Sequence, residues 1–286
     1  MSKALAEVVY TPEAAIRQPG QLLSSMFYDL LASRELTWRL FVRNLSAQYR
    51  QTVLGYVWAF LPPLATTLTF VFLNSQKIMN LAGDKSSVPY PVYVMVGMLL
   101  WQGFVDALNN PLKAINQSRS MLSKINFPRE ALIIAGMAEV LFNVIIRFIL
   151  LAAVYVWFGF TLPSTAWLAP LGILSLLGLG LMIGLMLAPL GVLYYDIQLT
   201  ITLFVSLWLF LTPVVYTPPT SWPASLLVTF NPVSPLLVTT REMLITGSLT
   251  HVSESLIISG ITLILLLLGW LLYRLAIPRL IERIGS

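Results

Sequence analysis

Cysteine is absent from this sequence, histidine occurs only once, as His251, and only 10% of the residues are charged. Without cysteine the chain has no disulfide framework, no thiolate metal site and no cysteine nucleophile. A single histidine also argues against a histidine-based metal cluster. No G-x-x-x-x-G-K-[ST] pattern occurs, because "AGDKSS" (82–87) has the Lys-Ser pair without the preceding glycine spacing. We therefore expect this chain itself to bind no metal, no ATP and no other cofactor.

Apolar residues dominate instead, at 57% of the 286 residues, with a mean hydropathy of +0.82. Soluble globular chains are nearer roughly 45–50% apolar. Apolar runs of about 18 or more residues are typical of transmembrane helices. We expect one all-α integral membrane domain over residues 51–286. Its six predicted spans cover 53–76, 90–110, 131–158, 167–194, 199–216 and 255–277.

The basic residues are distributed unevenly between the two sides of this arrangement. Thirteen of the 17 Lys and Arg residues fall in the N-terminal segment, the loop after the second span and the C-terminus, and three fall in the opposite loops. Cytoplasmic loops carry such an excess. The sequence therefore predicts a multi-pass protein of the cytoplasmic membrane with both termini in the cytoplasm.

The segment before the first span has two predicted parts. Residues 1–21 lack the apolar core of a signal peptide, and we expect a flexible tail. Residues 22–50 are predicted to form an amphipathic helix in the membrane interface, because apolar residues follow helical spacing there with arginines beside them. One interpretation is a simple anchor to lipid headgroups. The other is that arginines guide an anionic substrate headgroup through charge-assisted hydrogen bonds, the candidates being Arg39, Arg43 and Arg50.

Two ionisable residues, Glu139 and Arg147, lie well inside the third predicted span. Charges within a membrane are costly and usually face protein or water. Eight residues along a helix correspond to about 12 Å and about 80° of rotation, so the two cannot pair along one face. We expect each to have a partner on another element, and two roles stay open, namely a structural contact or the lining of a polar translocation path.

Aromatic residues are frequent near the ends of the spans, where most are typical of a membrane-interface belt. A second interpretation is that some rings contact sugars along a glycan path. The candidates for this role are Trp58, Trp101, Phe104 and Tyr194.

The predicted outer segment, residues 217–250, is the longest connection between spans. "ASLLVTF" (224–230) and "SPLLVTTREMLITG" (234–247) are predicted to form short helices, bounded by Ser, Pro and Gly. Half-buried outer helices of this kind could cap a pore, with Asn231, Pro232 and Arg241 as candidate gate residues. An ordinary packed outer loop is the alternative.

Several blocks together resemble the ABC-2 type transporter permeases that export polysaccharides. Each block is weakly specific alone, but their order and spacing agree from about residue 30 to 275. The blocks are "RQTVLGYVWAFLPP" (50–63), "YPVYVMVGMLLWQGF" (90–104), "LSKINFPRE" (122–130), "LAPLGVLYYDI" (187–197), "LTPVVY" (211–216) and "NPVSPLLVTTREML" (231–244). One departure is Tyr195-Asp196, where the family usually has Arg-Asp.

This resemblance implies a homodimer of six-helix subunits in the bacterial inner membrane, powered by a separate cytoplasmic ATPase dimer that binds ATP and magnesium. It implies a lipid-linked polysaccharide such as O-antigen as the substrate, with membrane lipids around the chain and no nucleic acid partner. The basic loop 116–128 would be the coupling helix that receives force from the ATPase, through Arg119, Ser120, Lys124 and Asn126. A topogenic basic loop is the alternative. The resemblance also implies that the short outer helices are re-entrant and gate the exit.

Three other functions stay open at this point. A permease of the same type could carry drugs or lipids. A membrane enzyme acting on lipid-linked sugars would need acidic residues clustered at one membrane face, whereas the acids here are scattered singly. An ion channel or secondary transporter would work without an ATPase.

Overall fold

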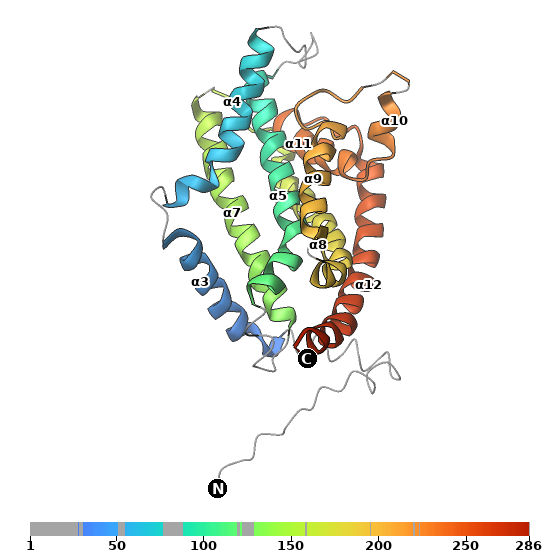
Figure 1. Ribbon diagram of the computed structural model, residues 1–286. Helices are drawn as coiled ribbons and strands as arrows, with labels where there is room; N and C mark the ends of the chain where they lie inside the picture. The colour runs from blue at the N-terminus through green and yellow to red at the C-terminus, as the bar shows by residue number, and fades with distance from the viewer. Residues whose placement is uncertain are drawn as a thin grey trace.

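The computed structural model describes residues 28, 31–50, 55–76, 88–118, 121, 129–157, 159–194, 196–219, 221–222 and 224–285. Within these ranges the regular structure is entirely helical, which confirms the all-α prediction (Figure 1). The elements are α3 (Arg34–Arg50), η1 (Gly55–Ala59), α4 (Leu61–Ser75), α5 (Tyr90–Gln117), α7 (Glu130–Trp157), η2 (Ser164–Leu168), α8 (Ala169–Leu193), α9 (Asp196–Leu211), α10 (Ala224–Thr229), α11 (Val233–Ile245) and α12 (Val252–Gly285).

Four helical segments in the described part of the chain are long and apolar enough to cross a membrane. They are Tyr90–Gln117, Glu130–Trp157, Ser164–Leu193 and Val252–Ile277, which match the predicted second, third, fourth and sixth spans. Helix α9 is apolar but has only 16 residues. Helix α5 lies at the centre, packed against α8 and α7, while α12 packs against α8 (Figure 1).

The first predicted span is not one continuous helix. The short η1 turn ends at Ala59, and α4 begins at Leu61 with Pro62 and Pro63 in its first turn. Proline has no backbone N–H, and its ring clashes with the carbonyl four residues earlier, so two adjacent prolines favour a new helix start. Residues 51–54 and 77–80 of the predicted span and its flank lie outside the described residues.

The glycines of α8 let its backbone approach α5 closely. A Cβ atom at Gly180 would lie 2.5 Å from the Phe104 carbonyl oxygen, and one at Gly184 would clash with the Leu108 carbonyl oxygen. Small residues at such spacing permit close packing of helices in lipid, where hydrophobic burial gives no driving force. On this side, α8 therefore packs directly against the protein.

Two short helices form where the outer segment was predicted to contain them. Helix α11 is buried against α8, α5 and α12, whereas the six-residue α10 lies beside it at the edge. Both lie at the end of the bundle opposite to α3 and the C-terminus (Figure 1). Within the predicted interface helix, residues 22–50, the structure describes α3, which lies along α7 with Leu40 buried and Trp38 64% exposed.

The close contact of α5 and α8 generates a stability prediction. Replacing Gly184→Leu should lower the stability of the purified chain by about 1–3 kcal/mol, because the new side chain meets the α5 backbone, which cannot move aside. Gly178→Leu is the matched control on the same helix, since a Cβ there would meet nothing closer than a Thr262 methyl group at 3.9 Å. Thermal unfolding in detergent measures both variants. Equal melting temperatures for the two would contradict the packing described here.

Candidate functional site

Two polar stripes face each other across the contact of α5 and α7. On α5, the stripe follows the spacing i, i+3, i+4 and i+7, which places its members on one face of a helix. It consists of Asp106, Asn109, Asn110 and Lys113. The α7 stripe supplies Gly136, Glu139, Val140, Asn143 and Arg147. Polar residues are thus concentrated between two helices that are otherwise apolar enough to span a membrane.

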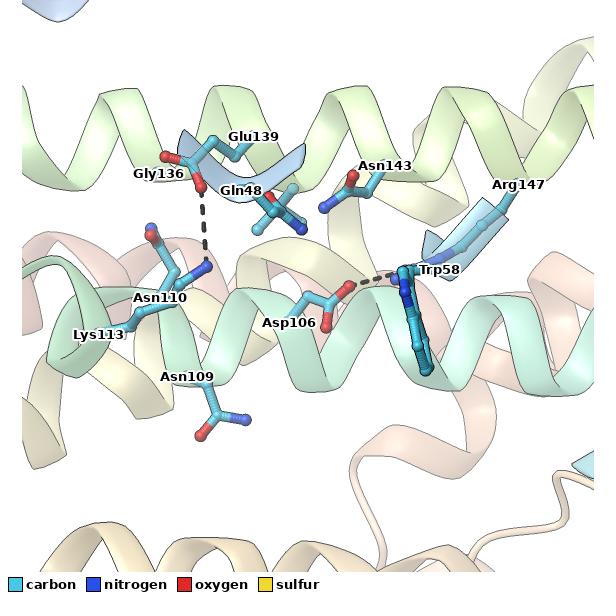
Figure 2. A pocket seen from close by; sticks show the side chains of 11 residues that line it. Gln48, Trp58, Asp106, Asn109, Asn110, Lys113, Gly136, Glu139, Asn143 and Arg147 are labelled. Carbon is cyan, nitrogen blue, oxygen red and sulfur yellow. Dashed lines mark ion pairs between the residues drawn. The ribbon is translucent and has the colours of Figure 1, made fainter. Parts of the chain in front are cut away.

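These stripes line a partly open cavity of about 190 Å³, completed by Gln48 from α3 and Trp58 from η1 (Figure 2). A water molecule needs only about 10–15 Å³ of such space, so the cavity can hold several waters or a small polar ligand. Trp58 and Lys113 are each about half exposed and lie at its edge.

Two ion pairs cross the cavity from one helix to the other. Arg147 Nη1 lies 2.7 Å from Asp106 Oδ2, and Lys113 Nζ lies 3.7 Å from Glu139 Oε2. The pairs lie seven residues apart on α5 and eight apart on α7, about two helical turns in each case. Figure 2 shows Gln48 and Asn143 between them. All four ionisable groups of the cavity are therefore matched in charge.

Hydrogen bonds fix this arrangement and connect it to α3. Asn44 Nδ2 on α3 donates to Glu139 Oε1 at 2.7 Å, and Gln102 Nε2 donates to Asp106 Oδ1 at 2.9 Å. The buried Asn110 donates from Nδ2 to the Ile133 carbonyl at 3.0 Å. A Cβ at Gly136 would collide with the Asn110 side-chain oxygen, so glycine is what allows this polar contact.

Glu139 and Arg147 are thus brought into one site, and each has its partner on α5. Asp106 and Lys113 were not predicted as these partners from the sequence. One signal was present: Asp106 is the one acidic residue within the second predicted span, and Arg147 is the one basic residue within the third. Opposite charges at one depth on adjacent spans indicate an ion pair, because neither is stable alone in lipid.

The arginines predicted to guide a headgroup do not line the cavity. Arg39 forms an exposed ion pair with Glu35 at 2.6 Å. Arg43 donates to Asn44 Oδ1 at 2.9 and 3.1 Å. The side chain of Arg50 lies outside the described residues. The two described arginines therefore lie along α3, beside the cavity and not within it.

The four aromatic candidates are separated by the fold. Trp58 lines the cavity, and Tyr194 is 62% exposed just after α8. Trp101 and Phe104 are buried in the core, where both rings pack against Trp208 at centroid distances of 6.4 and 5.5 Å. In this conformation these two rings have a packing role and face no open space.

The gate candidates Asn231 and Arg241 fix the outer helix to the rest of the bundle. Asn231 Oδ1 accepts hydrogen bonds from the Val233 backbone N–H and from Trp208 Nε1, both at 3.1 Å. Arg241 is buried and donates to the Pro213 carbonyl at 2.8 Å, with its guanidinium 3.9 Å above the Tyr93 ring. Pro232 is exposed directly before α11.

The remaining predicted residues, Arg119, Ser120, Lys124 and Asn126, lie outside the described residues. Of the predicted coupling segment, Asn116 is described and donates to Gln198 Oε1 at 3.2 Å. Among the residues that the structure describes, no cluster of three His, Asp or Glu side chains could hold a metal ion.

Three curated relatives cover most of this chain. An "O-antigen export system permease protein RfbA" from Myxococcus xanthus is 26% identical over 242 residues, which is 83% of this chain and 91% of that protein. Two proteins of the same name from Klebsiella pneumoniae are 23% and 24% identical over 217 residues, covering 73% of this chain and 80% of each relative.

A family comparison covers both the interface helix and the site. Residues 35–246 match the ABC-2 type transporter family, a range that includes α3, both polar stripes and α11. The match extends over more than half of the sequence and agrees with the order of blocks found along it. The chain belongs to the ABC-2 type transporter family.

Proposed function

We propose that this chain is the permease subunit of a transporter that exports a lipid-linked polysaccharide resembling O-antigen. The main support for this proposal is the similarity of the chain to three O-antigen export permeases over 73–83% of its length. The helical membrane domain and its polar cavity support it, because a hydroxyl-rich polymer needs polar surface to cross a hydrocarbon layer.

The transporter would contain two copies of this chain and a separate ATPase dimer. The absence of a P-loop pattern from the sequence supports a separate ATPase, since export against a gradient needs a source of energy. Each copy would span the bacterial inner membrane six times, with η1–α4 and α9 completing the four long spans. The excess of Lys and Arg supports cytoplasmic termini, and α3 lies at the same end of the bundle as the C-terminus (Figure 1).

Several residues have proposed roles in transport. Arg39, Arg43 and Arg50 would attract the anionic headgroup of the substrate at the membrane surface. Residues 116–128 would contact the ATPase. Helices α10 and α11 would gate the outer end, with α11 held by the buried Arg241 and its contacts to the segment after α9.

Polymer export tests this proposal directly. In a strain lacking its own permease, this chain together with its ATPase should restore polymer on the cell surface, measured by whole-cell labelling and by extraction of the accumulated lipid-linked form. A catalytically inactive ATPase is the control and should leave the polymer inside. Surface polymer that does not depend on the ATPase, or altered drug resistance without export, would contradict the proposal.

The ion pair of Asp106 and Arg147 generates a second prediction. Asp106→Leu should lower stability by about 3–5 kcal/mol, because it leaves the buried Arg147 charge without its carboxylate. The double variant Asp106→Leu/Arg147→Met should be more stable than this single variant. Thermal unfolding in detergent measures both changes.

Glu35→Gln is the matched control, because its pair with Arg39 is 75% exposed on both sides. Exposed pairs contribute about 0–1 kcal/mol, so this variant should melt close to the wild type. A single variant at Asp106 that melts no lower than Glu35→Gln would show that the buried pair does not stabilise the chain.

The proposed coupling segment generates a third prediction. Reversing both charges with Arg119→Glu and Lys124→Glu should abolish stimulation of ATP hydrolysis by the permease, because basic residues at a docking surface attract acidic partners. The variant should still insert and elute like the wild type. ATPase assays on the purified complex measure stimulation. Normal stimulation and normal export by the double variant would remove this segment from the coupling mechanism.

A further inference from the structure

We infer that the cavity between α5 and α7 binds a single uncharged sugar unit, and does not bind the phosphate-bearing headgroup of the substrate. This inference rests on the proposed function, since it names the part of a lipid-linked glycan that this cavity recognises. Three independent features of the cavity support it, namely its charge, the chemistry of its walls and its size.

The charge of the cavity favours a neutral ligand. Its two basic groups are each matched by a carboxylate, at 2.7 Å for Arg147 and Asp106 and at 3.7 Å for Lys113 and Glu139. A pyrophosphate entering between the pairs would meet Asp106 and Glu139 as well as the two cations. It would have to break existing ion pairs to be bound, and its own desolvation in a membrane would add to that cost. A neutral ligand keeps both pairs.

The groups between the ion pairs suit hydroxyl groups. Asn143 and Gln48 lie there (Figure 2), and an amide side chain carries both donor N–H groups and an acceptor oxygen. The carboxylates of Asp106 and Glu139 keep further acceptor positions, because an ionised carboxylate has about four lone-pair sites. A sugar hydroxyl both donates and accepts, so a wall that mixes amides and carboxylates can satisfy several hydroxyl groups at once.

The edge of the cavity adds an aromatic surface. Trp58 lines it and is 50% exposed, so one part of the indole packs on protein and another part is open to a ligand. A pyranose ring has an apolar face of C–H groups in addition to its hydroxyl rim, and an indole offers a large apolar surface with that geometry. Amides and carboxylates on one side and an indole on the other match these two surfaces of a sugar.

The size and position of the cavity fit one sugar unit within it. Its volume of about 190 Å³ is below the roughly 300–1,000 Å³ of sites that enclose drug-sized ligands. Asp106 lies 11 residues before the end of α5, about 16 Å, and Lys113 lies four residues before it, about 6 Å. The cavity thus extends from mid-span towards the end of the bundle that carries α3, and it is a local binding site and not a route through the whole membrane.

The test uses the purified permease–ATPase complex in lipid nanodiscs, with methyl glycosides of glucose, rhamnose and N-acetylglucosamine as probes and pyrophosphate as a competitor. Saturation-transfer NMR reports binding. At least one glycoside should bind, and Trp58→Ala and Asn143→Leu should each weaken its binding about fivefold or more, the effect of losing one good contact. Pyrophosphate in excess should not displace it. Trp157→Ala is the matched control, because Trp157 is 85% exposed at the far end of α7.

The outcomes separate this inference from the proposed function. No binding of any of the three glycosides, binding unchanged in both cavity variants, or displacement by pyrophosphate would overturn the sugar site. Size-exclusion elution of each variant confirms that it is folded, and Trp58→Ala, at a half-exposed position, should remain folded. If the wild-type complex exports polymer but binds no glycoside in the cavity, the inference fails and the proposed function stands. If the cavity binds a glycoside but the complex exports no polymer, the proposed function fails.

Discussion

A charged side chain within a bilayer is stable only when its charge is compensated, and the contact of α5 with α7 depends on this constraint. Asp106 and Arg147 compensate each other at 2.7 Å, with the arginine side chain only 8% exposed. Because neither residue is stable alone in lipid, the two helices must lie side by side and antiparallel in one register. That register then brings Lys113 opposite Glu139 and Asn110 opposite Gly136.

Helix α5 is held by different physical means on its two sides. Towards α7 the contact combines two ion pairs with apolar packing, as between Ala107 and Val140. Towards α8 it is a close backbone contact, possible because Gly180 and Gly184 carry no side chain. Lipid offers no hydrophobic force between helices, so packing and polar contacts must supply the association. Helix α5 therefore has a close backbone contact on its α8 side and a cavity within its α7 contact.

The features that could be predicted from the sequence are those that depend on the residues of a single segment. Apolar runs located α5, α7, α8 and α12, and the Ser, Pro and Gly boundaries located α10 and α11. The features that could not be predicted depend on which segments meet. The partner role of Asp106 requires the register of two helices, and the burial of Trp101 requires the position of Trp208. Pro62 and Pro63 indicate the break before α4. One continuous span was predicted there because the apolar run around the two prolines is long.

The two ion pairs of the cavity are not equally strong, and the difference has a direction along the bundle. Electrostatic attraction falls with distance and with exposure to solvent. The mid-span pair is close and largely buried, whereas Lys113 is 51% exposed and 3.7 Å from Glu139. Glu139 also accepts a hydrogen bond from Asn44 of α3, so its charge is shared between two elements. The Lys113–Glu139 pair is therefore the weaker of the two, and a displacement of α3 would change a partner of Glu139 before it reaches Asp106. A ligand between the pairs would contact the close Asp106–Arg147 pair at mid-span and the longer, more exposed Lys113–Glu139 pair at the other end of the cavity.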